Sequence, residues 1–176
     1  MTDAHISLPS IPRADWFGRL MRGLAIRIGS LAWLPKFLPQ ITALDKFIQR
    51  QTKGHWSILR LACLPGVLLT VPGRKSGVPR TTPLLCVPYL DGVLIAGSNF
   101  GGPTLPLWVN NLRAATSPSM VVDGQSVTVT ASELAGTDRD EAWAAMLALW
   151  PNYAKYAKRT DRTIPVFWLR PTDAGQ

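Results

Sequence analysis

The sequence predicts an α+β protein: a small, mostly antiparallel β-barrel, closed or split, with peripheral helices and a helical extension before it. Three observations predict this class. About six short runs with β-type patterning follow residue 66, and tight turns join most of them. Two helix-type segments interrupt these runs. The first 54 residues carry helical periodicity and an excess of basic side chains instead.

The extension is predicted to hold two helices. The first spans residues 15–34 with Asp15 as its N-cap, and the second spans 41–52 and ends before Gly54. Large apolar residues recur at every fourth position of the first helix: Trp16, Leu20, Leu24 and Ile28. Arginines lie between them, so the helix is expected to be apolar on one face and basic beside it.

The strands are predicted from β-type residues, alternation and turn signals. Tight turns at residues 91–92 and 123–124 are expected to close hairpins. In chain order the expected strands span Val67–Val71, Arg80–Tyr89, Val93–Ser98, Ser119–Val122, Gln125–Glu133 and Ile164–Leu169. Two helices are inserted between strands. One spans 106–114, and the other begins with Thr137 as its N-cap.

Charge is unevenly distributed along the 176 residues. Residues 1–62 hold nine basic and three acidic side chains, whereas the rest of the chain holds ten basic and eight acidic ones. The net charge of the whole chain is +8. Such an excess attracts an anionic partner, which is a phosphate-rich ligand, a lipid headgroup or a nucleic acid. Cys63 and Cys86 lie in apolar runs, so both are expected to be buried and reduced.

The segment 71–80 carries the most specific local chemistry. Gly73 and Gly77 permit backbone angles that let successive N–H groups point at one anion. The side chains that suit a phosphate are Arg74, Lys75, Ser76 and Arg80. Neither the Walker A nor the Rossmann spacing is present. We interpret the segment as a phosphate cradle between two strands, although an ordinary exposed turn, basic for solubility, explains these residues equally well.

Four blocks that follow one another along the chain are more specific than this turn alone. They are Gly73–Arg80 with Thr81–Leu85, then Gly97–Arg113, Trp150–Tyr156 and Thr160–Phe167. Together these blocks, within residues 55–171, resemble the deazaflavin-dependent nitroreductase and quinone reductase family. The resemblance implies a split β-barrel related to those that bind flavin mononucleotide. It also implies an oxidoreductase that uses reduced coenzyme F420, with flavin mononucleotide as the less favoured cofactor.

The resemblance also implies roles for individual residues. The basic turn would hold the cofactor's phosphate, and the second block would lie near its ring. The implied cofactor-binding residues are Gly73, Arg74, Lys75, Ser76, Gly77, Arg80, Pro83, Leu84, Ser98, Asn99, Trp108 and Asn111. The implied substrate-side residues are Trp150, Tyr153 and Tyr156. Leu105 and Trp150 depart from the family pattern, and both make the expected pocket more apolar.

The expected reaction is hydride transfer to an electron-poor acceptor, which is a quinone, a nitroaromatic compound or an activated enone. Negative charge then develops on the acceptor, and Tyr153, Tyr156 or Ser98 is expected to donate a hydrogen bond or proton to it. Core packing explains the aromatic residues as well, because Trp143, Trp150 and Tyr153 fit one buried helix face.

The chain is expected to divide into a basic extension, 1–54, a cofactor-binding barrel, 55–172, and a tail, 173–176. The extension is expected to contact a membrane surface through residues 15–50, or equally to pack on the barrel or on a second subunit. No signal peptide and no membrane-spanning run is visible. The expected location is therefore the cytoplasm, including the inner face of the membrane.

Other expectations concern partners and alternatives. A homodimer is expected, whereas nucleic-acid binding is not, because no recognised module is present. No metal site is expected, since His5 and His55 are isolated from other ligands. Two alternative functions remain: a flavin-mononucleotide-binding split-barrel reductase or oxidase, and a non-catalytic F420-binding protein.

Overall fold

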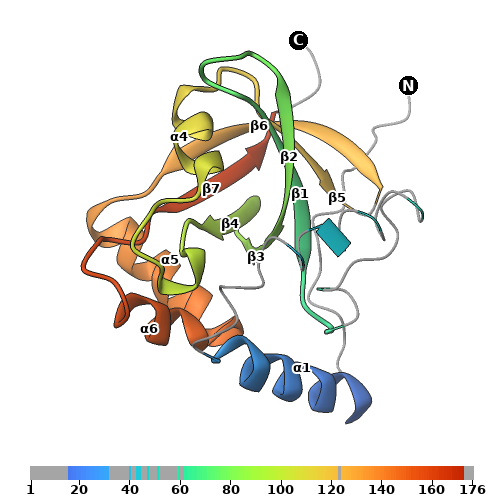
Figure 1. Ribbon diagram of the computed structural model, residues 1–176, viewed down its shortest axis with the longest axis vertical. Coiled ribbons are helices and arrows are strands. Elements are labelled where there is room, and N and C mark those ends of the chain that lie inside the picture. Colours follow the sequence, from blue (N-terminus) through green and yellow to red (C-terminus); the bar gives the residue numbers. More distant parts are fainter. Residues whose placement is uncertain are drawn as a thin grey trace.

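The structure is a computed structural model that describes residues 16–31, 40, 43–44, 47, 51, 59, 62–122 and 124–172. Within them, seven strands form one curled antiparallel sheet in the order β2-β1-β5-β6-β7-β4-β3 (Figure 1). The strands are β1 Gly66–Pro72, β2 Pro79–Leu85, β3 Val87–Tyr89, β4 Gly92–Ala96, β5 Ser119–Val122, β6 Gln125–Glu133 and β7 Val166–Pro171. The helices are α1 Trp16–Gly29, η2 Asn99–Gly101, α4 Leu107–Ala114, α5 Gly136–Leu149 and α6 Asn152–Ala157.

The curled sheet separates two apolar cores, and strand β4 contributes to both. Val93 and Ile95 belong to the core inside the barrel, whereas Leu94 belongs to the core beneath α5 and α6. Because successive side chains of a strand point to opposite faces, a strand covered on both sides is continuously apolar. Burying each such side chain stabilises the fold by about 1.5–3 kcal/mol.

The predicted fold class is confirmed, and most predicted elements coincide with observed ones. Strands β5 and β6 have the predicted bounds, while β1, β4 and β7 differ from theirs by one or two residues. Helix α4 begins one residue after the predicted start. Cys63 and Cys86 are free thiols, but only Cys86 is fully buried, so the expectation for Cys63 holds in part.

One predicted strand is wrong. The segment predicted as a single strand over 80–89 forms β2 and β3, which are interrupted at Cys86 and lie at opposite edges of the sheet. The Cys86 amide donates to the Pro65 carbonyl at 3.1 Å instead of joining a strand ladder. The chain therefore passes from one edge of the curled sheet to the other at this residue, which local alternation does not reveal.

The predicted start of α5 is also wrong. The helix begins at Gly136, and Ala135 occupies the N-cap position without a side-chain hydrogen bond. Gly136 has a φ of 55°, which glycine adopts easily, so the chain enters the helix before Thr137. Asp15, predicted as the N-cap of α1, lies outside the described residues, as does most of the helix predicted at 41–52.

Helix α1 lies against α6 at one end of the molecule (Figure 1). Among the residues of α1 whose burial is described, the fully buried ones are small: Gly18 and Gly29. Four of its large apolar side chains are exposed: Trp16 by 71%, Leu20 by 60%, Leu24 by 48% and Ile28 by 43%. No helix in the described part of the chain is long and apolar enough to cross a membrane.

Candidate functional site

The turn between β1 and β2 satisfies most of its own backbone. The Gly73 amide donates to the Val78 carbonyl, and the amides of Ser76 and Gly77 both donate to the Gly73 carbonyl. The Val78 amide donates to Ser76 Oγ at 3.4 Å. Among the described residues, only the Lys75 amide of this turn finds no acceptor. The expected cup of free amide groups is therefore not what the turn presents.

The side chains of the turn remain available to an anion. Arg74, Lys75 and Arg80 are exposed, and within the described residues none of them pairs with a carboxylate. A Cβ placed on Gly73 would lie 2.7 Å from Ser76 Oγ and 3.3 Å from Arg80 Nε. A side chain at position 73 would thus displace the hydroxyl and the guanidinium that converge there. Their chemistry fits a phosphodiester, which accepts charge-assisted hydrogen bonds.

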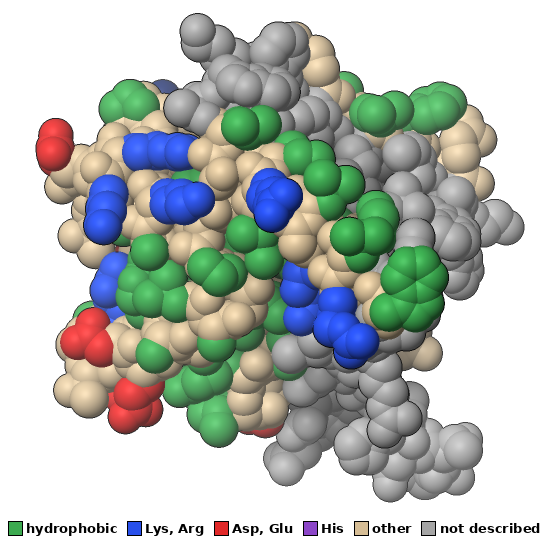
Figure 2. Space-filling model, turned by 90° about the horizontal axis from the view of Figure 1, so that it is seen from below, with side chains coloured by type: hydrophobic (Ala, Val, Ile, Leu, Met, Phe, Trp, Pro, Cys, Tyr) green, Lys and Arg blue, Asp and Glu red, His purple; other side chains and the backbone are tan. Residues whose placement is uncertain are grey.

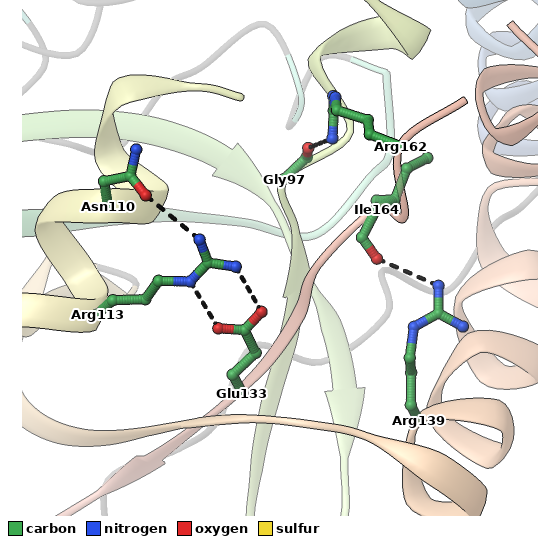
Figure 3. A network of polar contacts seen from close by, with 7 residues as sticks. All are labelled: Gly97, Asn110, Arg113, Glu133, Arg139, Arg162 and Ile164. Atoms are coloured by element: carbon green, nitrogen blue, oxygen red, sulfur yellow. Dashed lines mark hydrogen bonds and ion pairs between the residues drawn. The ribbon is translucent and has the colours of Figure 1, made fainter. Parts of the chain in front are cut away.

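Helix α4 is joined to this turn by a buried amide. Asn111, 8% exposed, accepts a hydrogen bond from the Arg74 amide at 3.2 Å through its Oδ1. The last turn of α4 is also tied to β6, because Arg113 makes a two-bonded ion pair with Glu133 at 2.7 Å (Figure 3). Arg113 also donates to Asn110 at 3.3 Å. The structure therefore brings Asn111 and the basic turn together, a contact that the sequence did not predict, and their roles in cofactor binding stay predictions.

A second segment, the loop 97–102 between β4 and α4, has an unusual backbone. Asn99, Phe100 and Gly101 have successive φ values of 46°, 53° and 82°. Non-glycine residues rarely adopt this left-handed region, and such strain persists only where the surroundings impose it. Within the described residues the amides of Ser98, Asn99 and Phe100 have no acceptor, in contrast to those of the turn.

An arginine that the sequence analysis did not single out holds this loop. The Arg162 guanidinium donates to the carbonyls of Gly97 at 3.0 Å, Ser98 at 2.8 Å and Gly102 at 3.1 Å. Figure 3 shows the Arg162 side chain directed at Gly97. Two residues after Arg162 in the chain, the Ile164 carbonyl accepts a hydrogen bond from Arg139 of α5 at 3.2 Å. Burial lowers the pKa of the Arg162 guanidinium, because it removes water from the charge.

The remaining predicted cofactor residues lie on β2 and α4. Pro83 and Leu84 are half-buried in β2, where Pro83 lies opposite Leu68 of β1. Trp108 is buried on α4, with its ring centroid 5.9 Å from that of Phe167 in the barrel core. Trp108 is therefore chiefly a core residue in this structure.

The aromatic residues predicted for the substrate side lie elsewhere, in the core beneath α1 and α6. Trp150, Tyr153 and Tyr156 are all at least 92% buried. Burial raises the pKa of the Tyr153 phenol and raises that of Tyr156 to about 12. A higher pKa makes a phenol a weaker proton donor. A catalytic role for either tyrosine stays a prediction, and it requires α1 to move.

Helix α1 covers these aromatic residues through its last turn. The Tyr156 hydroxyl donates to the Gly29 carbonyl at 2.7 Å, and Asn152 donates to the Ile26 carbonyl at 2.7 Å. A Cβ on Gly29 would lie only 2.5 Å from the Trp150 ring. Tyr156 thus supplies a partner for a carbonyl at the end of α1, where helix carbonyls lack backbone donors, whereas Asn152 shares the Ile26 carbonyl with the Ser30 amide.

Phe100 joins the loop to these aromatic residues and was not predicted. Its ring centroid lies 5.3 Å from that of Tyr156. At Gly101, a Cβ would lie 2.7 Å from the Tyr156 carbonyl oxygen, so the loop packs tightly on α6. No group of histidine, cysteine and acidic residues within the described part of the chain could hold a metal.

Comparisons with known proteins identify the family of this chain. The model of a family described as F420H2-dependent quinone reductase matches residues 44–171. An F420H2-dependent quinone reductase of Mycobacterium tuberculosis is 33% identical over 141 residues, which are 78% of this chain and 95% of the relative. A putative F420H2-dependent quinone reductase of Mycobacterium bovis matches to the same extent.

Two solved structures extend the comparison to the fold. One, described as an F420H2-dependent reductase, is 35% identical, covers 60% of this chain and 93% of its own, and has a TM-score of 0.55. The other, described as a domain-swapped dimer, is 31% identical, covers 71% and 98%, and has a TM-score of 0.58. The resemblance drawn from the four sequence blocks is thus confirmed, and the protein is an oxidoreductase whose cofactor is coenzyme F420. The chain belongs to the F420H2-dependent quinone reductase family.

Proposed function

We propose that this protein transfers a hydride from reduced F420 to a quinone, with the cofactor bound between the basic turn and the loop 97–102. Family membership supports the reaction class. The observation that carries the site assignment is the convergence of Ser76 Oγ and Arg80 Nε at Gly73, next to the exposed Arg74 and Lys75. These groups suit a cofactor that carries a phosphodiester and carboxylates.

The residues of the chain have separate tasks in this proposal. Arg74, Lys75 and Arg80 bind the charged tail of the cofactor, and Ser76 adds a hydroxyl donor. Ser98 and Asn99 lie at the ring, on a backbone that the fold holds rigidly. Leu84, half-buried against the barrel core, supplies apolar surface beside the ring.

Bound F420H2 supplies the hydride, and the protein must place the acceptor within about 3–3.5 Å of the donor carbon. Two electrons and one proton reach the quinone with that hydride, and a second proton must reach its oxygen to complete the hydroquinone. Ser98 is the favoured donor of a hydrogen bond to that oxygen, because its hydroxyl lies on the positioned loop. Tyr153 and Tyr156 serve as donors only if α1 moves away, since both are buried here.

The test is a comparison of cofactors and acceptors with the full chain. We expect oxidised F420 to bind and flavin mononucleotide to bind more weakly, and we expect F420H2 to reduce a soluble quinone such as menadione. Nitroaromatic compounds and activated enones are further proposed acceptors and should be assayed in parallel. Preferred binding of flavin mononucleotide would support the alternative flavin-dependent barrel. F420 binding without reduction of any acceptor would support a non-catalytic F420-binding protein.

We further propose that α1 contacts an anionic membrane, where a lipid-soluble quinone would be found. The exposed apolar stripe of α1 includes Leu20 and Leu24, and Arg27 lies exposed beside it. The exposed Lys155 lies on α6, against which α1 packs, and the exposed Lys158 is its C-cap residue. Figure 2 views the molecule from this side and shows Lys and Arg side chains next to apolar ones. Apolar insertion combined with basic flanks is typical of helices that lie in a membrane surface.

Sedimentation with vesicles tests this contact. We expect binding to vesicles that contain anionic lipid, weaker binding to zwitterionic vesicles, and a loss of binding for Leu20→Asp. The matched control is Leu90→Asp, because Leu90 is also exposed, by 75%, but lies at the β3–β4 turn. Equal sedimentation of Leu20→Asp and the unchanged protein would contradict the proposal, as would an absence of binding at both low and high salt.

A homodimer is also proposed. Support comes from a similar solved structure described as a domain-swapped dimer and from β2, an edge strand whose first residues are exposed. Sedimentation equilibrium over a range of protein concentrations tests it, and a monomer mass at all concentrations would exclude it.

A further inference from the structure

We propose that Arg162 is a positioning residue of the cofactor site, whose guanidinium fixes the loop 97–102 so that Ser98 and Asn99 face the deazaflavin. The inference rests on the proposed function, which assigns Ser98 and Asn99 to the cofactor ring. Arg162 itself comes from the segment that leads into β7, which is distant in sequence from the loop.

The Arg162 guanidinium contacts the loop at both of its ends. Arg162 Nη1 donates to the Gly97 carbonyl, Nη2 to the Ser98 carbonyl and Nε to the Gly102 carbonyl, at 2.8–3.1 Å. One planar group thus binds both ends of the loop at once. The guanidinium has its donors in a fixed fork, whereas the single ammonium of lysine cannot span these three acceptors.

The loop has a backbone conformation that its surroundings must hold in place. Asn99 and Phe100 hold positive φ values that are unfavourable for residues with a Cβ, so the surroundings must impose them. The Asn99 side chain donates a hydrogen bond to the Thr104 carbonyl at 3.0 Å, which ties the loop to the residues that follow it. Arg162 binds the loop through its carbonyl groups. With its carbonyls committed to Arg162, the loop has a backbone orientation that is fixed before the cofactor binds.

The positive charge of Arg162 faces carbonyl groups of the loop. Within the described residues no carboxylate pairs with Arg162, so its charge is balanced by three carbonyl dipoles. A half-buried cation whose sole partners are one loop's carbonyls costs desolvation energy that a neutral residue would avoid. In this proposal that cost is offset by a task at the loop, namely a fixed backbone and a positive potential near the ring.

The experiment compares Arg162→Lys and Arg162→Gln with the matched control Arg139→Lys. Arg139 also donates to a carbonyl, that of Ile164, but it does not touch the loop. The readouts are the Kd for oxidised F420, measured by fluorescence titration of the full chain, the Tm, and kcat and KM with menadione. We expect Arg162→Lys and Arg162→Gln to raise the Kd for F420 at least about tenfold. We expect Arg139→Lys to lower the Tm and to leave the Kd within about twofold of that of the unchanged protein. We also expect guanidinium ion at millimolar concentration to restore part of the affinity of Arg162→Ala.

Two results would overturn the proposal, and they differ. If Ser98→Ala and Asn99→Ala weaken F420 binding but Arg162→Lys changes only Tm, the loop is at the cofactor and Arg162 has a general structural role. If Ser98→Ala and Asn99→Ala leave the Kd unchanged, the assignment of the loop to the cofactor fails, and the role of Arg162 fails with it.

Discussion

The turn 73–77 and the loop 97–102 are both predicted to contact the cofactor, but they place charge in opposite ways. In the turn, the backbone bonds to itself and the cations Arg74 and Lys75 extend into solvent. In the loop, the cation Arg162 lies behind the backbone and binds its carbonyls. Long exposed side chains can follow a flexible charged tail, whereas a rigid ring that must be aligned for hydride transfer needs a fixed backbone.

The largest expected effect tests the side-chain half of this comparison. Replacing Arg74 and Lys75 together by alanine should weaken F420 binding by about 2–4 kcal/mol, because charge-assisted bonds to phosphate are lost. Affinity of the unchanged protein should also fall with added salt, and the double variant should lose most of this dependence. The measurement is a titration with oxidised F420 at two ionic strengths.

The control for this prediction is Lys155→Ala with Lys158→Ala, which removes two exposed cations from α6 and its C-cap. An equal loss of affinity in that variant would mean that net charge, and not the turn, attracts the cofactor. The exposed cations of the turn would then have no specific role in binding the cofactor.

The next effect concerns the helix beneath the loop. Tyr156→Phe removes the hydroxyl that donates to Gly29 and should lower the free energy of unfolding by about 1–2 kcal/mol, because a buried carbonyl loses its partner. Chemical denaturation measures this, with Tyr153→Phe as the control that keeps the Gly29 contact. A fall in kcat without a loss of stability would instead show that Tyr156 acts on the acceptor, as the sequence analysis expected.

The fold was largely predictable from the sequence because hairpins are local. The β3–β4 turn consists of Leu90 and Asp91, one residue before the predicted turn at 91–92, and the alternation in 125–133 defines β6 without reference to other strands. The break at Cys86 was not predictable, since it depends on a hydrogen bond to Pro65 across a chain crossing. The start of α5 was missed because glycine, and not the side chain of Thr137, determines it.

The site was predictable only in part. The basic residues of the turn were proposed as phosphate ligands from their chemistry, and this role stays a prediction. The resemblance placed Asn111 on a helix that closes the pocket, and its hydrogen bond with the Arg74 amide was not predicted. Arg162 was missed because its partners are backbone carbonyls of the loop 97–102, which carry no sequence signature. Burial of Tyr153 and Tyr156 beneath α1 was likewise invisible, because a helical aromatic pattern suits a pocket wall and a packed core equally well.

A smaller effect tests how the turn is held. Asn111→Ala leaves the Arg74 amide without its acceptor and should weaken F420 binding by about 1 kcal/mol, since the turn loses its tie to α4. The matched control is Asn110→Ala, which changes the neighbouring residue and leaves the turn untouched. Equal affinities for the two variants would indicate that the turn is positioned by its own hydrogen bonds alone.

The smallest expected effect concerns the ion pair that ties α4 to β6. The hydrogen bonds from Arg113 lower the pKa of the Glu133 carboxyl below its ordinary value. The pair therefore stabilises the fold above the unfolded-state pKa of about 4.3, and its contribution disappears as pH falls through the lower, folded-state pKa. Because both side chains are partly exposed, Glu133→Gln should cost only about 0.5 kcal/mol at pH 7. Denaturation of both proteins from pH 7 to pH 2 should show this difference vanishing with acid. A difference that persists at pH 2 would mean that Glu133 stabilises α4 by packing and not by charge, so the helix that carries Asn111 would be held without this ion pair.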